Sequence, residues 1–108
     1  MQQDAMLIQL GYLPNESLLK QLQEIENNTS GYKKIQKNIM DLHDNLRVDG
    51  SFIALSNSKS YFKIKIEALN PVQVQEAHEK VKHFSNKFKV KVQKLDNKET
   101  YYILGFEN

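Results

Sequence analysis

The sequence of 108 residues contains no cysteine and no tryptophan, and it has only two prolines and four glycines. Without cysteine the chain has no disulfide, no thiolate nucleophile and no zinc site with thiolate ligands. This composition also fits a reducing compartment. The glycines are scattered, at Gly11, Gly31, Gly50 and Gly105. The sequence therefore has neither a phosphate-binding glycine-rich loop nor a dinucleotide-binding fingerprint.

Long hydrophobic runs are also missing. The most apolar stretch, residues 5–13, is interrupted by Gln9 and Gly11. It is shorter than the ~20 residues that a membrane-spanning helix needs. The first residues are polar and do not resemble a signal peptide. We therefore expect a cytoplasmic protein with no membrane partner.

Charge of one sign does not dominate the chain, whose formal net charge is +2. Its distribution is uneven, because residues 1–50 carry five Lys or Arg and seven Asp or Glu, whereas residues 51–108 carry ten Lys and six acids. A basic second half favours anionic partners, and the alternative is a lysine-rich solvated surface. The length and the ordinary composition predict one globular domain over residues 1–108.

The first half of the chain predicts a strand followed by helices. Apolar residues alternate over residues 5–13 with further apolar residues between them, which is typical of a strand with both faces covered. Asn15 is a candidate helix N-cap, and apolar residues then recur at helical spacing up to Ile25. A cluster of helix-breaking residues at 27–31 precedes a second amphipathic stripe. The segment 15–46 forms either two helices or one bent helix.

The second half predicts strands and one more helix. Residues 51–56 and 61–67 form two strands joined by a turn at 57–59, and the second alternates sharply between apolar and polar residues. Asn70, Pro71 and Gln73 are a strong helix start for residues 70–86. Residues 88–93 and 100–106 then form two strands around a turn at 96–98.

The expected order is β-α(α)-β-β-α-β-β, which makes the chain an α+β protein. Two halves of this kind commonly fold as a split β-α-β sandwich, the ferredoxin-like arrangement. This fold has an antiparallel sheet with the helices on one face. The resemblance is one of architecture alone and implies no function.

The chain lacks a recognisable catalytic constellation. His78 and His83 are five residues apart, so on a helix they point about 140° away from each other and cannot share a metal. His43 lies between Asp41 and Asp44, two carboxylates that would raise its pKa. We interpret it as a solvated surface group. We therefore expect no cofactor, no metal and no enzymatic activity.

One possible binding surface is the solvent-exposed face of the sheet. If the strands pair as in the split β-α-β fold, this face collects lysines and tyrosines, namely Tyr61, Lys63, Lys65, Lys89, Lys91 and Tyr101. Lysines attract phosphates, and aromatic rings stack on unpaired bases. This predicts binding of single-stranded RNA or DNA. The aromatic motif of RNA-recognition modules is absent, and lysines that only keep an exposed sheet soluble are the alternative.

The other possible binding surface is a helix. Three helices are predicted where about two would cover one sheet face. The surplus helix could pack across the others, cover the second sheet face or dock a partner. The candidate docking stripe is the one with the most regular spacing, and it consists of Tyr32, Ile35, Ile39, Leu42 and Leu46. This interpretation predicts a non-enzymatic interaction module that forms a homo-oligomer or binds a protein partner. From the sequence alone we prefer it over nucleic-acid binding.

Overall fold

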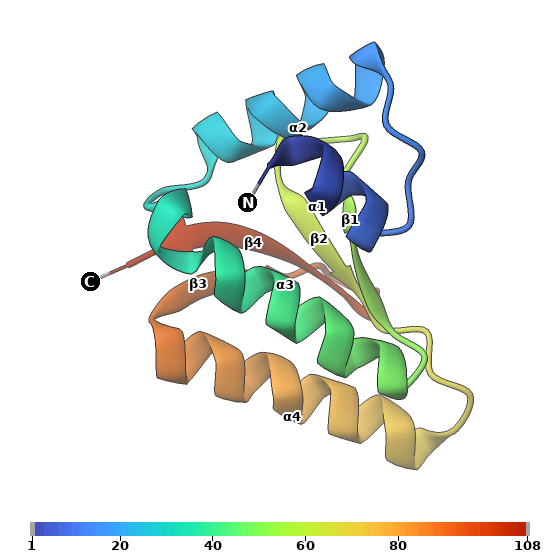
Figure 1. The fold of residues 1–108 in the computed structure, drawn as a ribbon. Coiled ribbons are helices and arrows are strands. Elements are labelled where there is room, and N and C mark those ends of the chain that lie inside the picture. Colours follow the sequence, from blue (N-terminus) through green and yellow to red (C-terminus); the bar gives the residue numbers. More distant parts are fainter. Residues whose placement is uncertain (1, 108) are drawn as a thin grey trace.

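A computed structural model describes residues 2–107 and is shown in Figure 1. Within this range three helices precede a first pair of strands, and a fourth helix leads into a second pair. The elements are α1 (Gln3–Gln9), α2 (Glu16–Asn28), α3 (Tyr32–Val48), β1 (Phe52–Leu55), β2 (Phe62–Lys65), α4 (Pro71–Phe88), β3 (Val90–Lys94) and β4 (Thr100–Phe106).

The four strands form one antiparallel sheet in the order β1-β2-β4-β3. Consecutive strands pair as β1–β2 and β3–β4, and β2 pairs with β4 in the middle of the sheet. The α4 helix connects the two strand pairs. A register shift between β3 and β4, at Lys91 and Val92, introduces an irregularity near the C-terminal end of β4.

The strand expected over residues 5–13 is wrong, because residues 5–9 belong to α1 and residues 10–13 form no strand. Met6, Leu7 and Leu10 are buried, whereas Ile8 is 61% exposed and Leu13 is 86% exposed. Residues 5–13 are therefore apolar on every side, but only one face of this segment is buried. Gly11, with φ of +95°, lies just after this short helix in a conformation that favours glycine.

The ferredoxin-like arrangement is not confirmed. Its first strand is a helix here, and the four remaining strands adopt the order β1-β2-β4-β3. The broader prediction of an α+β protein with an antiparallel sheet is confirmed.

Residues 15–46 form two helices rather than one bent helix. The Asn15 side chain accepts a hydrogen bond from the Leu18 N–H and caps the start of α2. Thr29 is extended and Gly31 is left-handed, so the chain leaves α2 before α3 begins. Between the two helices, the Ser30 carbonyl accepts a hydrogen bond from the Phe106 N–H at 2.7 Å and ties this turn to the end of β4.

The start of α4 agrees with its sequence signal. The Asn70 side chain accepts from the Gln73 N–H at 2.9 Å, and Pro71 occupies the first turn, where its missing N–H costs nothing. The helix ends at Lys89, whose backbone is left-handed with φ of 57°.

The core lies between one face of the sheet and the helices, with α3 and α4 side by side across that face (Figure 1). Tyr32 of α3 stacks on Phe62 of β2, with 5.9 Å between ring centroids. The sheet contributes a row of fully or almost fully buried side chains: Ile53, Leu55, Phe62, Ile64 and Ile103.

The outer edge of β1 is blocked by side chains. The Ile53 N–H donates to His43 Nδ1 at 3.0 Å, and the Leu55 N–H donates to the Tyr12 hydroxyl at 3.1 Å. These hydrogen bonds occupy donors that an unprotected edge strand would offer to another chain.

Candidate nucleic-acid interface

The face of the sheet opposite the core is uncovered. None of the helices within residues 2–107 crosses it (Figure 1). Side chains alternate along β2, with Phe62 and Ile64 buried and Lys63 and Lys65 partly exposed on the other side. We call this surface the open face and define it by Tyr61, Lys63, Lys65, Lys91, Gln93 and Tyr102.

The strand register brings lysine and tyrosine together on the open face. Lys63 lies opposite Tyr102, and Tyr102 lies opposite Gln93 on β3. Directly opposite residues in an antiparallel pair point to the same side of the sheet. Tyr61 immediately precedes β2, and its ring lies 5.5 Å from that of Tyr102 at an interplanar angle of 41°. The two rings and the Lys63 side chain therefore lie next to one another on the same side of the sheet.

The two open-face tyrosines differ in accessibility. Tyr102 is only 8% exposed, whereas Tyr61 is partly exposed and lines an open hollow together with Lys59, Ser60 and three α2 residues, Glu24, Asn27 and Asn28. Tyr61 is therefore the ring that can accept a stacked base, and Tyr102 supports it from the sheet.

Four of the six residues predicted for a nucleic-acid site lie on the open face: Tyr61, Lys63, Lys65 and Lys91. Tyr101 points to the helical side instead, where its hydroxyl hydrogen-bonds to His78 of α4 at 2.6 Å. Lys89 is the left-handed residue that ends α4 and does not belong to a strand. Tyr102 is the tyrosine that the prediction missed, because adjacent residues of a strand exchange faces when the register changes by one.

The residues predicted as an interaction stripe are covered. Every one of them belongs to the hydrophobic core and is at most 9% exposed: Tyr32, Ile35, Ile39, Leu42 and Leu46. The sheet and the neighbouring helices pack against this stripe, so in this chain it is not a free surface.

The open-face lysines differ in their partners. Lys65 forms an ion pair with Glu67 at 3.3 Å, and Lys91 approaches Glu107 at 3.9 Å. Both pairs are solvent-exposed, so they hold the lysines only weakly against a competing phosphate. The Lys63 ammonium forms no ion pair with any residue between 2 and 107.

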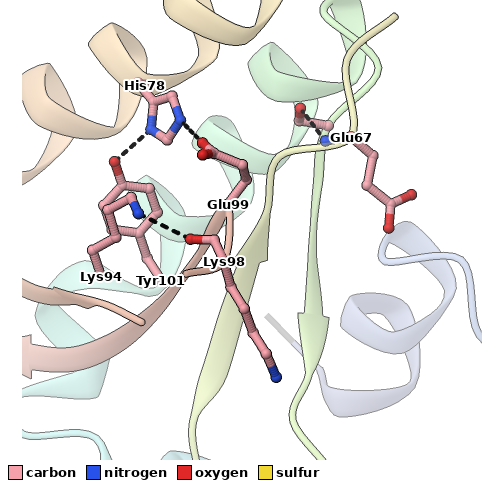
Figure 2. Close-up of polar contacts among 7 residues, drawn as sticks. Glu67, His78, Lys94, Lys98, Glu99 and Tyr101 are labelled. Carbon is pink, nitrogen blue, oxygen red and sulfur yellow. Dashed lines mark hydrogen bonds and ion pairs between the residues drawn. The ribbon is translucent and has the colours of Figure 1, made fainter. Parts of the chain in front are cut away.

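A second polar cluster lies on the helical side of β4 and is drawn in Figure 2. His78 stands between two partners, with Nδ1 facing the Tyr101 hydroxyl and Nε2 facing the Glu99 carboxylate. Burial, followed by the Glu99 charge, raises the pKa of Tyr101. The two contacts of His78 join α4 to the start of β4. No local sequence pattern indicates this cluster, because its members come together only through the sheet register.

His43 is a buried structural residue, and its prediction as a solvated group is wrong. It is 1% exposed. Its Nδ1 accepts from Ile53, so the ring is neutral and Nε2 donates to the Gln9 carbonyl at 3.1 Å. Burial lowers the pKa of His43 and outweighs the opposing effects of the Gln9 hydrogen bond and Asp44.

Residues 2–107 contain no cluster of three or more His, Asp or Glu side chains arranged to hold a metal. Among the described helices, none combines the length and apolar character needed to cross a membrane. Comparison with protein-family models, with curated proteins and with solved structures gave no match.

Proposed function

We propose that this chain is a binding domain that holds single-stranded nucleic acid on its open face, without catalysing a reaction. The observation that carries the proposal is the pairing of Lys63 with Tyr102 on an uncovered sheet surface, with the Tyr61 ring packed beside them. Lysine supplies attraction to phosphates that does not depend on sequence, and an accessible ring supplies stacking for a base.

The position of the charge supports single strands over duplexes. The lysines lie on a sheet surface rather than on a projecting helix that could enter a major groove. A sheet with an accessible ring suits splayed bases, as in other proteins that bind single strands on sheet faces.

A protein partner is the competing proposal, and the burial of the helix stripe weakens its original basis. Docking through Tyr32, Ile39 or Leu46 would require the core to open. A partner would instead have to cover another surface, such as the open face itself.

The experiment is a binding titration with labelled single-stranded oligonucleotides of about 12 nucleotides, in DNA and RNA forms, followed by fluorescence anisotropy. The matched variants are Lys63→Glu with Lys65→Glu on the open face, and Lys33→Glu with Lys37→Glu on exposed positions of α3. Both pairs change the net charge equally.

The proposal expects the open-face pair to lose at least tenfold in affinity and the α3 pair to lose much less. Equal losses would mean diffuse charge attraction and would overturn the open face as a site. Light scattering that shows a dimer whose interface is broken by the open-face pair, with no oligonucleotide bound, would favour the protein partner instead.

A further inference from the structure

A hollow of about 390 Å³ runs over the open face between β2 and β4. Its walls include Lys63 and Lys65 from β2, Lys98 from the turn before β4, and Tyr102. Serine hydroxyls from the β1–β2 turn line it as well. The hollow therefore combines ammonium groups with hydroxyl donors, which is the chemistry that binds a phosphate oxyanion.

The hydroxyl groups of Ser56, Ser58 and Tyr102 form a hydrogen-bonded chain. Ser56 Oγ accepts from the N–H groups of Ser58 and Lys59, at 3.3 and 3.4 Å. Ser56 Oγ also lies 3.2 Å from Ser58 Oγ. Ser58 Oγ in turn lies 3.0 Å from the Tyr102 hydroxyl, and in each of these two contacts either oxygen can donate.

When Ser58 Oγ is the donor to the Tyr102 oxygen, the Tyr102 O–H has no acceptor within residues 2–107 and is free to donate to a ligand. Hydrogen bonds in series polarise one another, so this terminal O–H is a stronger donor than an isolated phenol. The pKa of Tyr102 is accordingly lowered, first by the Ser58 and Ser56 hydroxyls and further by the charges of Lys59 and Lys98.

The acidic residues of the hollow already have partners. Glu67 pairs with Lys65, and Glu99 binds His78 on the helical side (Figure 2). Figure 2 also shows the Lys98 side chain running away from the His78 cluster. Lys63 and Lys98 form no ion pair with any described residue, so their charges are available to a ligand.

We infer that this hollow is a phosphate-binding site in which the Tyr102 hydroxyl donates to a phosphate oxygen and Lys63 and Lys98 neutralise its charge. The inference rests on the proposed function, because the phosphate belongs to the bound strand. The phosphate is either an internal diester or a terminal monoester, and the probes below separate these sources.

The test compares Tyr102→Phe, which removes only the hydroxyl and keeps the ring, with Tyr101→Phe as the matched control on the other side of β4. Each variant is titrated with oligonucleotides that carry either a 5′-hydroxyl or a 5′-phosphate, and with inorganic phosphate while backbone amide NMR signals are followed. Ser58→Ala and Lys98→Ala provide second variants, so the outcome does not depend on the folding of one protein.

We expect Tyr102→Phe to bind oligonucleotide about tenfold more weakly, as loss of a hydrogen bond to a charged group implies, and Tyr101→Phe to bind like the original protein. Inorganic phosphate should shift the amide signals of Ser58 and Lys59. A loss seen only with the 5′-phosphorylated probe assigns the site to a terminal phosphate, and an equal loss with both probes assigns it to an internal one.

Two results separate this inference from the proposed function. Oligonucleotide binding that is unchanged in Tyr102→Phe, Ser58→Ala and Lys98→Ala would overturn the phosphate site and leave the open face as the interface. Phosphate-induced shifts at Ser58 without binding of any oligonucleotide would support the hollow as an anion site and overturn the proposed function.

Discussion

Lys63 and Tyr102 are cross-strand neighbours on β2 and β4, the two central strands of the sheet, and both point away from the helices. This central position holds the pair in place, because each of the two strands is hydrogen-bonded to a neighbouring strand on both sides. An edge strand would hold the same residues less firmly. The pairing therefore places the Lys63 cation beside the largely buried Tyr102 ring, on the sheet face that no described helix covers.

The stacking role of Tyr61 can be tested by removing its ring. Tyr61→Ala should weaken oligonucleotide binding by ~1–3 kcal/mol, because a base loses its stacking surface. Tyr61→Phe keeps the ring and should bind almost normally. Both affinities come from anisotropy titrations at one salt concentration. Equal binding by all three proteins would show that no base stacks at this position.

The buried His43 predicts a dependence of stability on pH. Its pKa in the folded protein lies below the ordinary value of 6.5. The folded state therefore excludes the proton that the unfolded chain accepts, so stability is complete above about pH 6.5 and falls as the pH drops through that value. The slope contributed by this one group is at most ~1.4 kcal/mol per pH unit.

Urea unfolding between about pH 7.5 and 5 measures this effect, with His43→Gln as the comparison. The variant should be less stable at neutral pH but should lose less stability on acidification. If both proteins respond to pH in parallel, the histidine at position 43 is not the group responsible.

Gly105 is predicted to be intolerant of any side chain. Its φ is +140°, and a Cβ atom would lie 2.6 to 2.8 Å from the N, O and Cβ atoms of Ser30. Gly105→Ala should cost ~2 kcal/mol or more, because strain adds to a clash with backbone atoms that cannot move away easily.

Gly11 is the matched control for this substitution. It also has a positive φ, of +95°, but an added Cβ would meet no atom within 4 Å. Gly11→Ala should therefore cost less than Gly105→Ala in thermal or urea unfolding. The reverse order would contradict the close approach of β4 to the turn between α2 and α3.

The core packing of α4 gives a further stability prediction. Phe84 is 3% exposed, and its ring lies 5.9 Å from that of Phe88. Phe84→Ala should destabilise the fold by ~3–5 kcal/mol through lost burial and the cavity that remains. Val72→Ala, at a position 66% exposed on the same helix, should change stability by less than ~0.5 kcal/mol.

The sequence predicted those elements whose local signals agree with their tertiary environment. The cap at Asn70 and Pro71 correctly marked the start of α4, and the alternation over residues 61–67 correctly predicted β2. The strand over 100–106 agrees with β4 residue for residue. In each case a local pattern was enough to define the element, and along β2 the alternation also defined the buried side.

The sequence-based prediction failed where an apolar pattern was compatible with both a strand and a helix. The run at 5–13 is apolar on every side, so the periodicity does not distinguish a doubly covered strand from a short helix with exposed Ile8 and Leu13. Once this segment is a helix, the expected strand order is lost as well.

The candidate site was predictable only in part for a related reason. Lys63 and Lys65 follow from the alternation of β2 itself, so their face could be predicted. Whether Tyr101 or Tyr102 joins them depends on the register between β2 and β4. This register is set by hydrogen bonds between residues that lie far apart in the sequence. Lys89 does not belong to the site, because α4 extends to Phe88 and Lys89 is the left-handed residue that follows it.

The most direct test of the open face as a nucleic-acid interface is the salt dependence of oligonucleotide binding. Each phosphate neutralised on a single strand contributes about −0.7 to the slope of log Kobs against log salt. If Lys63, Lys65 and Lys98 each neutralise one phosphate, the original protein should give a slope of about −2. Lys63→Glu with Lys65→Glu should flatten this slope markedly, whereas Lys33→Glu with Lys37→Glu should leave it nearly unchanged. An unaltered slope in the open-face variant, or no binding at about 50 mM salt, would contradict the account.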